Sequence, residues 1–331
     1  METAPPSATT SRLGRSALAF VMCGLLLYAA LYYAAEQLMR STGRSNPFFK
    51  IATMEQPAAD WVILGASHAM PLDFDGFNAL MERETGLKIV NLASPGTGPL
   101  YNRFVLEHFL REHRTRNVLY VVDSFAFYSR TWNEERFADS KLLARTPRDP
   151  AIAARLWQYV RQEGVDPRAL LDYATGFSKI NNRDRFNTDI WEGEAQFDRA
   201  WRPSASAVKK RIDYLYPDHT PAAVLDRYMG EFSKLLDTAR QAGARVTIVK
   251  LPAPPGYRSQ LPAEAQFDEA ILRVSAQHGV AVRDFSTAIG EPRSYFDTDH
   301  LNRAGLTEFF NRYLKNVLMD GASARDAAPV P

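Results

Sequence analysis

Three side chains that lie far apart in the sequence have the types that perform acyl transfer. Ser67 follows an apolar run at residues 61–64 and Gly65, and residues 297–300 read Asp-Thr-Asp-His near the C-terminus. A serine hydroxyl becomes a nucleophile when a histidine removes its proton, and a carboxylate must orient the histidine ring. We therefore predict that Ser67 is a nucleophile, that His300 is its base and that Asp297 orients the base.

Each of these residues also has an ordinary structural interpretation. Ser67 can cap a helix, Asp297 or Asp299 can cap the last helix, and His300 can be a surface residue. Gly-x-Ser alone is a common pattern, and only its combination with Asp-x-x-His favours catalysis. His68 is a candidate for substrate contact rather than for proton transfer, because neighbours in sequence often point in different directions.

The elements that must position these residues follow from the hydrophobic pattern. Short apolar runs predict buried strands at 61–64, 88–92, 117–122, 245–251 and 280–282. Helical spacing predicts helices at about 72–85, 100–110, 221–242, 262–278 and 303–318, with Thr220 as an N-cap before Pro221. Strands that alternate with helices favour a three-layer α/β/α sandwich with a parallel sheet. Ligands bind such sheets beyond the carboxyl ends of the strands, where Ser67 is expected to lie.

Near the N-terminus lies an uncharged stretch of 20 residues, Ser16–Ala35. At 1.5 Å per residue it spans about 30 Å, the thickness of a bilayer core. Arg12 and Arg15 precede it, so the positive-inside rule predicts a single-pass inner-membrane protein with residues 1–15 in the cytoplasm and a periplasmic body. We expect an uncleaved signal anchor over 16–38. A cleaved signal peptide and a buried helix of a soluble protein remain open.

The other boundaries follow from composition. Residues 39–59 are expected to link the anchor to a catalytic domain at 60–319, and residues 320–331, like residues 1–15, are expected to be disordered. The alternation of strands and helices stops between about 124 and 216, which predicts a mostly helical insertion. Its aromatic and basic residues can bind an acidic glycan, or can belong to a solvated helical subdomain. They are Trp132, Trp157, Trp191, Trp201, Arg183, Arg185, Arg202, Lys209, Lys210 and Arg211.

Charge and spacing argue against several other classes of protein. The 331-residue chain has a net charge of +2, so nothing in its bulk charge points to nucleic acid. No group of His, Cys and Asp has the spacing of metal ligands, and Gly96-x-Gly98 lacks the lysine of a phosphate-binding loop. The single cysteine, Cys23, cannot form an intramolecular disulfide. We therefore expect no metal and no cofactor.

With these residues in view, the chain resembles the GDSL-like hydrolases of the SGNH superfamily. The resemblance rests on Gly65-Ala66-Ser67-His68 after the first strand, on Gly96 after the second, and on Asp297 and His300 before the last helix. It covers about residues 60–318, without the insertion. It implies a flavodoxin-like sheet, an acyl-Ser67 intermediate, and an oxyanion hole formed by the N–H groups of Ser67 and of Gly96 or Gly98.

One position departs from the resemblance. The family usually has an asparagine after the third strand that completes the oxyanion hole, whereas this chain has Asp123. An ionised carboxylate would repel an oxyanion, so Asp123 must be protonated, turn away or take another role such as substrate contact. Ser124 or Asn102 is then expected to donate instead. Loss of one donor can cost on the order of 100-fold in rate, so the departure concerns efficiency rather than reaction type.

Part of the superfamily is similar to this chain in further respects. Accessory proteins of cell-surface polymer acylation also combine one N-terminal membrane helix, an extracytoplasmic SGNH-like domain and Asp-x-x-His-Leu-Asn. They include alginate O-acetyltransferase-like proteins and the D-alanyl transfer protein of teichoic acid synthesis. The similarity implies an O-acyltransferase, with acetyl as the favoured group, that modifies a polysaccharide together with a multi-span membrane-bound O-acyltransferase. A membrane-anchored carbohydrate esterase and a non-catalytic scaffold for such an acyltransferase are the alternatives.

Overall fold

The structure is a computed structural model that describes residues 8–42, 46–183 and 191–323. Its centre is a five-stranded parallel sheet with the strand order β2-β1-β3-β4-β5. The strands are β1 (Ala58–Leu64), β2 (Ile89–Asn91), β3 (Arg114–Val121), β4 (Arg245–Lys250) and β5 (Ala281–Asp284). The predicted parallel sheet is confirmed. The direction of winding reverses between β1 and β3, which is where ligands bind in flavodoxin-like sheets.

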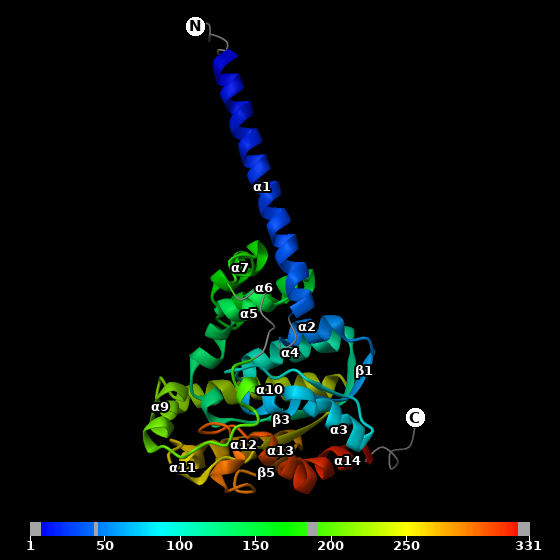
Figure 1. Cartoon of the computed structure of the whole chain (residues 1–331), viewed down its shortest axis with the longest axis vertical. Coiled ribbons are helices and arrows are strands. Elements are labelled where there is room, and N and C mark those ends of the chain that lie inside the picture. The colour runs from blue at the N-terminus through cyan, green and yellow to red at the C-terminus, as the bar shows by residue number, and fades with distance from the viewer. Residues whose placement is uncertain (1–7, 43–45, 184–190, 324–331) are drawn as a thin grey trace.

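Helices cover both faces of the sheet, which confirms the three-layer arrangement (Figure 1). One face packs against α4 (Pro99–Glu112), α10 (Ala222–Gln241) and α12 (Glu264–His278), and the other against α3 (Phe77–Thr85), α13 (Arg303–Phe309) and α14 (Lys315–Ser323). Successive side chains of β1 alternate between the two cores. Val62 enters the core below α4 and α10, and Ile63 enters the core on the opposite face.

Two helix ends differ from the prediction. Helix α10 begins at Ala222 because Pro221 has an extended conformation (φ −65°, ψ 128°) and stands at the N-cap, so Thr220 does not cap the helix. The last helix consists of α13, one π turn (Phe310–Leu314) and α14, and it extends past the predicted end at 318 to Ser323. Leu318 is buried, and its carbonyl accepts a hydrogen bond from Trp61 Nε1 at 3.2 Å. Residues 320–323 are therefore helical rather than disordered, and residues 324–331 lie outside the described residues.

The insertion is mostly helical, as predicted. Its helices are α5 (Ser140–Arg145), α6 (Pro150–Gln162), α7 (Pro167–Thr175), α8 (Phe177–Ile180) and α9 (Ala205–Leu215). Short 3-10 turns include η2 (Ser124–Phe127), η3 (Arg130–Trp132), η4 (Glu134–Ala138) and η5 (Glu194–Gln196). Three of the helices begin after an aspartate, Asp139, Asp149 or Asp166, whose carboxylate accepts a hydrogen bond from the backbone of the first turn. These caps explain why so polar a segment forms helices. Two further short elements, α11 (Pro255–Arg258) and η6 (Pro292–Ser294), lie near the C-terminal strands.

The N-terminal apolar stretch forms a single long helix, α1 (Ala8–Thr42), which projects from the body (Figure 1). Its residues 12–40 are long and apolar enough to cross a membrane. The last turns are not free, because Ala35, Glu36 and Met39 are buried against the body. The Glu36 carboxylate binds Lys179 Nζ of α8 and accepts the Arg148 N–H at 2.9 Å. The helix is thus fixed to the insertion by a buried ion pair.

The expected linker at 39–59 is not a free spacer. After residues 43–45, which lie outside the described residues, helix α2 (Pro47–Thr53) buries Phe48, Phe49 and Ile51 in the body. Asn46 caps α2 by accepting the Phe48 N–H at 2.9 Å. The apolar side chains of this short segment enter the core, and their burial attaches the predicted linker to the body.

Substitution of Glu36 by alanine should destabilise the body strongly. Among the described residues, Lys179 Nζ would remain buried with the Thr146 carbonyl at 2.7 Å and the Tyr32 ring as its partners. Breaking a buried ion pair from one side costs about 3–5 kcal/mol. Urea unfolding of the detergent-solubilised chain measures the change. Arg40→Ala is the matched control, because Arg40 is 52% exposed in its pair with Glu36 and should contribute less than about 1 kcal/mol. Equal effects of the two substitutions would contradict this prediction.

Candidate active site

The turn that carries Ser67 is held from several sides. Gly65 has φ +146°, and a Cβ at this position would lie 2.7 Å from the Val121 carbonyl oxygen, so only glycine fits. The Gly65 N–H donates to Asn102 Oδ1 at 3.0 Å, and the Gly65 carbonyl accepts the Thr97 hydroxyl at 3.1 Å. Ser67 then begins the 3-10 helix η1 (Ser67–Gly76) and is buried. Its hydroxyl is therefore placed beyond the carboxyl end of β1.

The structure brings Ser67, His300 and Asp297 together. His300 Nε2 lies 2.9 Å from Ser67 Oγ, and His300 Nδ1 lies 2.9 Å from both carboxylate oxygens of Asp297. Asp297 also accepts the backbone N–H of His300 at 2.9 Å, which fixes the loop in this shape. The ring of Phe296 stacks on His300 with a centroid distance of 5.4 Å. A nucleophile, a base and an orienting carboxylate thus stand in hydrogen-bonding order.

A second charged network lies beside these three residues. His68 Nδ1 is 2.5 Å from Asp123 Oδ1, and His68 Nε2 is 3.1 Å from Asp299 Oδ2. Arg211 Nε of α9 donates to both oxygens of Asp299, at 2.9 and 3.1 Å. The centroids of the His68 and His300 rings lie 4.7 Å apart. Asp299 is therefore shared between the insertion, His68 and the loop that carries the base.

The pKa values follow from these contacts. Burial lowers the pKa of His68, but Asp123 and Asp299 outweigh burial and raise this pKa to about 10. Burial raises the pKa of Asp299, yet His300, Arg211 and His68 hold it well below its usual value. In the same way His300 keeps the pKa of Asp297 low. His68 is therefore a buried cation at neutral pH, and it faces the carboxyl groups of Asp123 and Asp299.

The stability that His68 contributes should depend on pH. Its pKa is about 10 in the folded protein and 6.5 as the ordinary value, so the folded state binds more protons between these limits. The contribution is complete below pH 6.5 and is lost as the pH rises toward 10. Urea midpoints of the wild type and His68→Gln should differ most near pH 6 and converge near pH 10. A difference that stayed constant over this range would contradict the assignment of charge to His68.

Ser67 borders a cavity of about 260 Å³ between the loop after β2 and the insertion. Trp132, Trp191 and Tyr214 line it with aromatic rings, and Arg136, Arg211 and Glu192 line it with charges of both signs. Arg136 also donates to the Pro95 carbonyl at 2.7 Å, which holds the loop next to Ser67. An aromatic and polar cavity of this kind can bind a sugar ring or an acyl ester.

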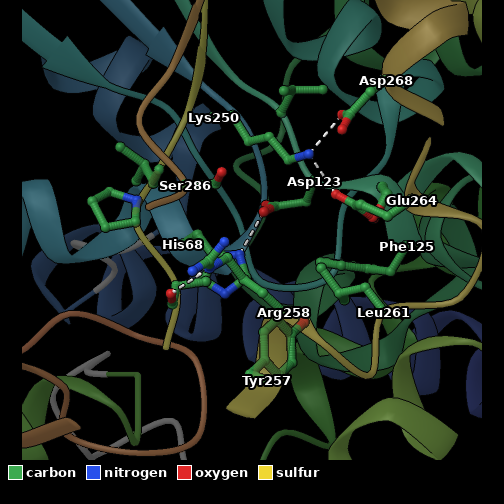
Figure 2. Close-up of a pocket in the computed structure, with 15 residues that line it drawn as sticks. His68, Asp123, Phe125, Lys250, Tyr257, Arg258, Leu261, Glu264, Asp268 and Ser286 are labelled. Atoms are coloured by element: carbon green, nitrogen blue, oxygen red, sulfur yellow. Dashed lines mark hydrogen bonds and ion pairs between the residues drawn. The ribbon is translucent and has the colours of Figure 1, made fainter. Parts of the chain in front are cut away.

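Figure 2 shows a separate cavity of about 190 Å³ on the other side of His68. His68 and Asp123 border it, together with Lys250, Glu264 and Asp268. Lys250 Nζ pairs with Glu264 and with Asp268 at 2.6 Å each. Ser67 does not line this cavity, so we assign the chemistry to the cavity that contains the nucleophile.

Several predicted donors and contacts have other roles. The Gly98 N–H donates to the Trp132 carbonyl at 2.6 Å, so it cannot hold an oxyanion. The Ser124 hydroxyl contacts Tyr216 at 2.7 Å and also Glu264. Asn102 is buried and committed to Gly65 and Gly98, which excludes both donation to an oxyanion and contact with substrate. The Gly98 N–H, the Ser124 hydroxyl and the Asn102 amide thus have other partners in the loops that shape the site, and their predicted roles gain no support from these contacts.

Two predicted oxyanion donors remain. Within the described residues, the N–H groups of Ser67 and Gly96 have no hydrogen-bond partner, and both residues border the nucleophile's cavity. Gly96 has φ +60°, and a Cβ on it would meet the Trp132 ring at 2.8 Å. Asp123 does not replace the missing asparagine, because its carboxylate is turned to His68. The two backbone donors of the predicted hole are thus free among the described residues, and Asp123 Oδ1 is paired with His68.

Sequence reasoning missed three residues of this site. Asp299 was expected at most to cap the last helix, but Asn302 is the cap and accepts the Gly305 N–H at 2.9 Å. Arg211 and Trp191 stood undistinguished among the aromatic and basic residues of the insertion. Of the other tryptophans, Trp132 lines the cavity, Trp157 is exposed and Trp201 is half-buried. Arg185 lies outside the described residues.

His68, Asp299 and His300 also form a group whose ligand-type atoms lie within 4.8 Å of one another. Both ring nitrogens of His68 face carboxylates, and those of His300 face Ser67 and Asp297. These hydrogen bonds explain why the three side chains lie so close together.

No protein-family model and no curated protein matches the sequence. Among solved structures, a Bacteroides fragilis protein assigned as an acylhydrolase is similar over 82% of this chain and 94% of its own, with 8% identity and a TM-score of 0.41. A GDSL-like lipase from Bacteroides thetaiotaomicron is similar over the same shares, with 9% identity and a TM-score of 0.40. Likenesses of this size carry no argument about activity, which must come from the site itself.

Proposed function

We propose that this protein is a serine acyl-transfer enzyme, and more specifically a membrane-anchored O-acyltransferase, acetyl being the favoured group, that acts on a polysaccharide outside the cytoplasm. The observation that carries the proposal is the order Ser67–His300–Asp297, with 2.9 Å at each contact. In this order the Ser67 hydroxyl has a base, and the base has an anion that selects its tautomer.

The reaction has two balanced halves. His300 Nε2 takes the Ser67 proton while Ser67 Oγ attacks the acyl carbonyl, and the N–H groups of Ser67 and Gly96 hold the oxyanion. The tetrahedral species collapses, the leaving alcohol takes the proton from His300, and acyl-Ser67 remains. An acceptor hydroxyl then gives its proton to His300 and attacks acyl-Ser67. Collapse of the second tetrahedral species returns the proton to Ser67 and releases the new ester.

The surroundings of Ser67 favour a sugar as the acceptor. Trp191 and Tyr214 offer faces on which a pyranose ring can stack. Arg211, whose Nε is paired with Asp299, can direct its other N–H groups to a carboxylate of an acidic polymer. The alternative of a non-catalytic scaffold was based on Asp123 at the position of the usual oxyanion asparagine. This argument is weaker because Asp123 pairs with His68. The periplasmic location and a multi-span membrane-bound O-acyltransferase as partner belong to the proposal and rest on the resemblance and the N-terminal charges.

The proposal is tested with the full-length chain in nanodiscs. p-Nitrophenyl acetate serves as donor and an acidic oligosaccharide as acceptor, and mass spectrometry measures acetyl-oligosaccharide, free acetate and acetyl-Ser67. We expect acetyl-oligosaccharide from the wild type and from the surface control Ser259→Ala, and none from Ser67→Ala. Free acetate as the only product would favour an esterase. No acetyl-Ser67 from a folded chain would leave the scaffold interpretation.

A further inference from the structure

Large apolar side chains are exposed on the insertion near the anchor helix. Outside α1, the described residues expose six such side chains, which are Trp157, Leu171, Phe177, Tyr214, Leu272 and Met319. The first three fall within 21 residues on helices α6, α7 and α8. Leu171 is 64% exposed and Phe177 is 61% exposed. We call these three residues the insertion apolar face.

Helix α7 packs one face against the body and exposes apolar side chains on its other face. Ala169 and Tyr173 are buried, and the Tyr173 hydroxyl donates to the Pro147 carbonyl at 2.7 Å. Leu171 and Ala174 are exposed on the other side, and Phe177 follows directly after the helix ends at Thr175. Arg168 is exposed one turn before Leu171. The outward side thus combines apolar side chains with a cation, as in helices that lie at a bilayer surface.

The contacts of α1 fix the height of this face relative to the membrane. Gly176, between α7 and α8, lies so close to α1 that a Cβ on it would meet the Tyr32 ring at 2.6 Å. Lys179 Nζ and the Arg148 guanidinium lie 5.4 and 5.6 Å from the centre of the same ring. Tyr32 belongs to the uncharged stretch Ser16–Ala35, which is only as long as a bilayer core is thick. The junction of α7 and α8 therefore lies where the membrane segment leaves the bilayer.

Figure 1 agrees with this placement. Helix α7 lies at the end of the body from which α1 projects, and the next helix, α8, contacts α1, while α11 and α12 lie toward the opposite end. Leu272 of α12 is 55% exposed and lies in that distant part. The insertion apolar face is therefore next to the anchor, whereas an equally exposed leucine elsewhere is not.

We propose that the insertion apolar face binds the surface of the same bilayer that α1 crosses. Leu171 and Phe177 enter the boundary between headgroups and acyl chains, with Trp157 beside them at the headgroup level. Arg161 and Arg168, both exposed, face lipid phosphates. The body is then attached at two places, by α1 and by α7–α8, and its tilt over the membrane is fixed. The proposal rests on α1 spanning the membrane and does not depend on the acyl-transfer activity.

The test uses the full-length chain with Cys23 replaced by serine and a single cysteine introduced as Leu171→Cys, Phe177→Cys or, as matched control, Leu272→Cys. Each cysteine carries an NBD fluorophore, and the protein is reconstituted in vesicles of phosphatidylcholine and phosphatidylglycerol. A lipid with a shallow doxyl group and aqueous iodide serve as quenchers. We expect the doxyl lipid to quench NBD at 171 and 177 at least about twofold more than at 272, and iodide to show the reverse order.

Two results would overturn the proposal. NBD at 171 and 177 that iodide quenches as strongly as at 272 would place the face in water. NBD that is shielded from both quenchers would mean that protein rather than lipid covers it. Hydrogen–deuterium exchange of the unmodified chain gives an independent measurement, in which α7 should exchange more slowly in nanodiscs than after delipidation while α12 is unchanged. Neither quenching nor hydrogen exchange depends on acyl transfer. Failure of this proposal can therefore be distinguished from failure of the proposed function.

Discussion

His300→Gln should lower kcat for p-nitrophenyl acetate by at least about 10⁴-fold, because serine attack without a base loses most of its rate. Glutamine can still contact Ser67 Oγ, which lies 2.9 Å from His300 Nε2, but it cannot take the proton. KM should change little, since the ester is held by the cavity and the oxyanion donors rather than by His300. Initial rates and labelling of Ser67 by a fluorophosphonate measure the effect, and both should fall together.

The matched control is a histidine that takes no part in the site. His278 at the end of α12 contacts Ser233 Oγ at 2.6 Å, far in sequence from the nucleophile's loop. His278→Gln should therefore retain activity within about twofold, because its partners Ser233 and Asp237 do not border the site. Activity of His300→Gln within tenfold of the wild type would mean that another group removes the Ser67 proton.

Asp297→Asn should lower kcat by about 10³- to 10⁴-fold with little change in stability. Both carboxylate oxygens of Asp297 lie 2.9 Å from His300 Nδ1 and hold the proton on that nitrogen, which leaves Nε2 free to accept from Ser67. An asparagine amide can donate to Nδ1 and so favour the opposite tautomer. Because the Asp297 side chain is 36% exposed, the exchange of charge for amide is tolerated by the fold.

The variant Asp299→Asn tests whether Asp299 orients the His300 ring or only stabilises the fold. Asp299 is fully buried and faces Arg211 and His68, while its distance to His300 Nδ1 is 3.6 Å. We expect this variant to lose stability by about 3 kcal/mol or more, since two buried cations lose their shared anion, and to lose less kcat than Asp297→Asn. Steady-state rates at a temperature where both variants are folded, together with urea midpoints, measure the two effects. A larger loss of kcat in Asp299→Asn would assign the orienting role to Asp299.

The sheet could be predicted from the sequence because its strands are local apolar runs with clear ends. Trp61–Leu64 is buried on both faces, and Gly65 ends it at a turn that only glycine can make. The place of Ser67 then follows from the strand that precedes it. Asp297 and His300 were predictable for a similar reason, since they are three residues apart on one loop and the loop geometry brings them together.

What could not be predicted depends on contacts between distant segments. Arg211 reaches Asp299 across 88 residues of sequence, and Trp191 approaches Ser67 from a part of the insertion with no regular pattern. From the sequence, Gly96 and Gly98 were equal candidates for the second oxyanion donor. The structure separates them, because the Gly98 N–H donates to the Trp132 carbonyl. Asp123 had three possible states by chemistry alone, and its pairing with His68 decides among them. In each case a tertiary partner, invisible in a local window, sets the role.

The ion pair between Glu36 and Lys179 also limits how the chain can be processed. A peptidase cut between Ala35 and Glu36 would remove Tyr32 from Gly176 and would put a new α-ammonium on the residue whose carboxylate binds Lys179. Burial already lowers the pKa of Lys179, so a second cation close to this carboxylate would weaken the attachment of the insertion. We therefore expect a body cut at this position to be less stable than one that retains its first helix.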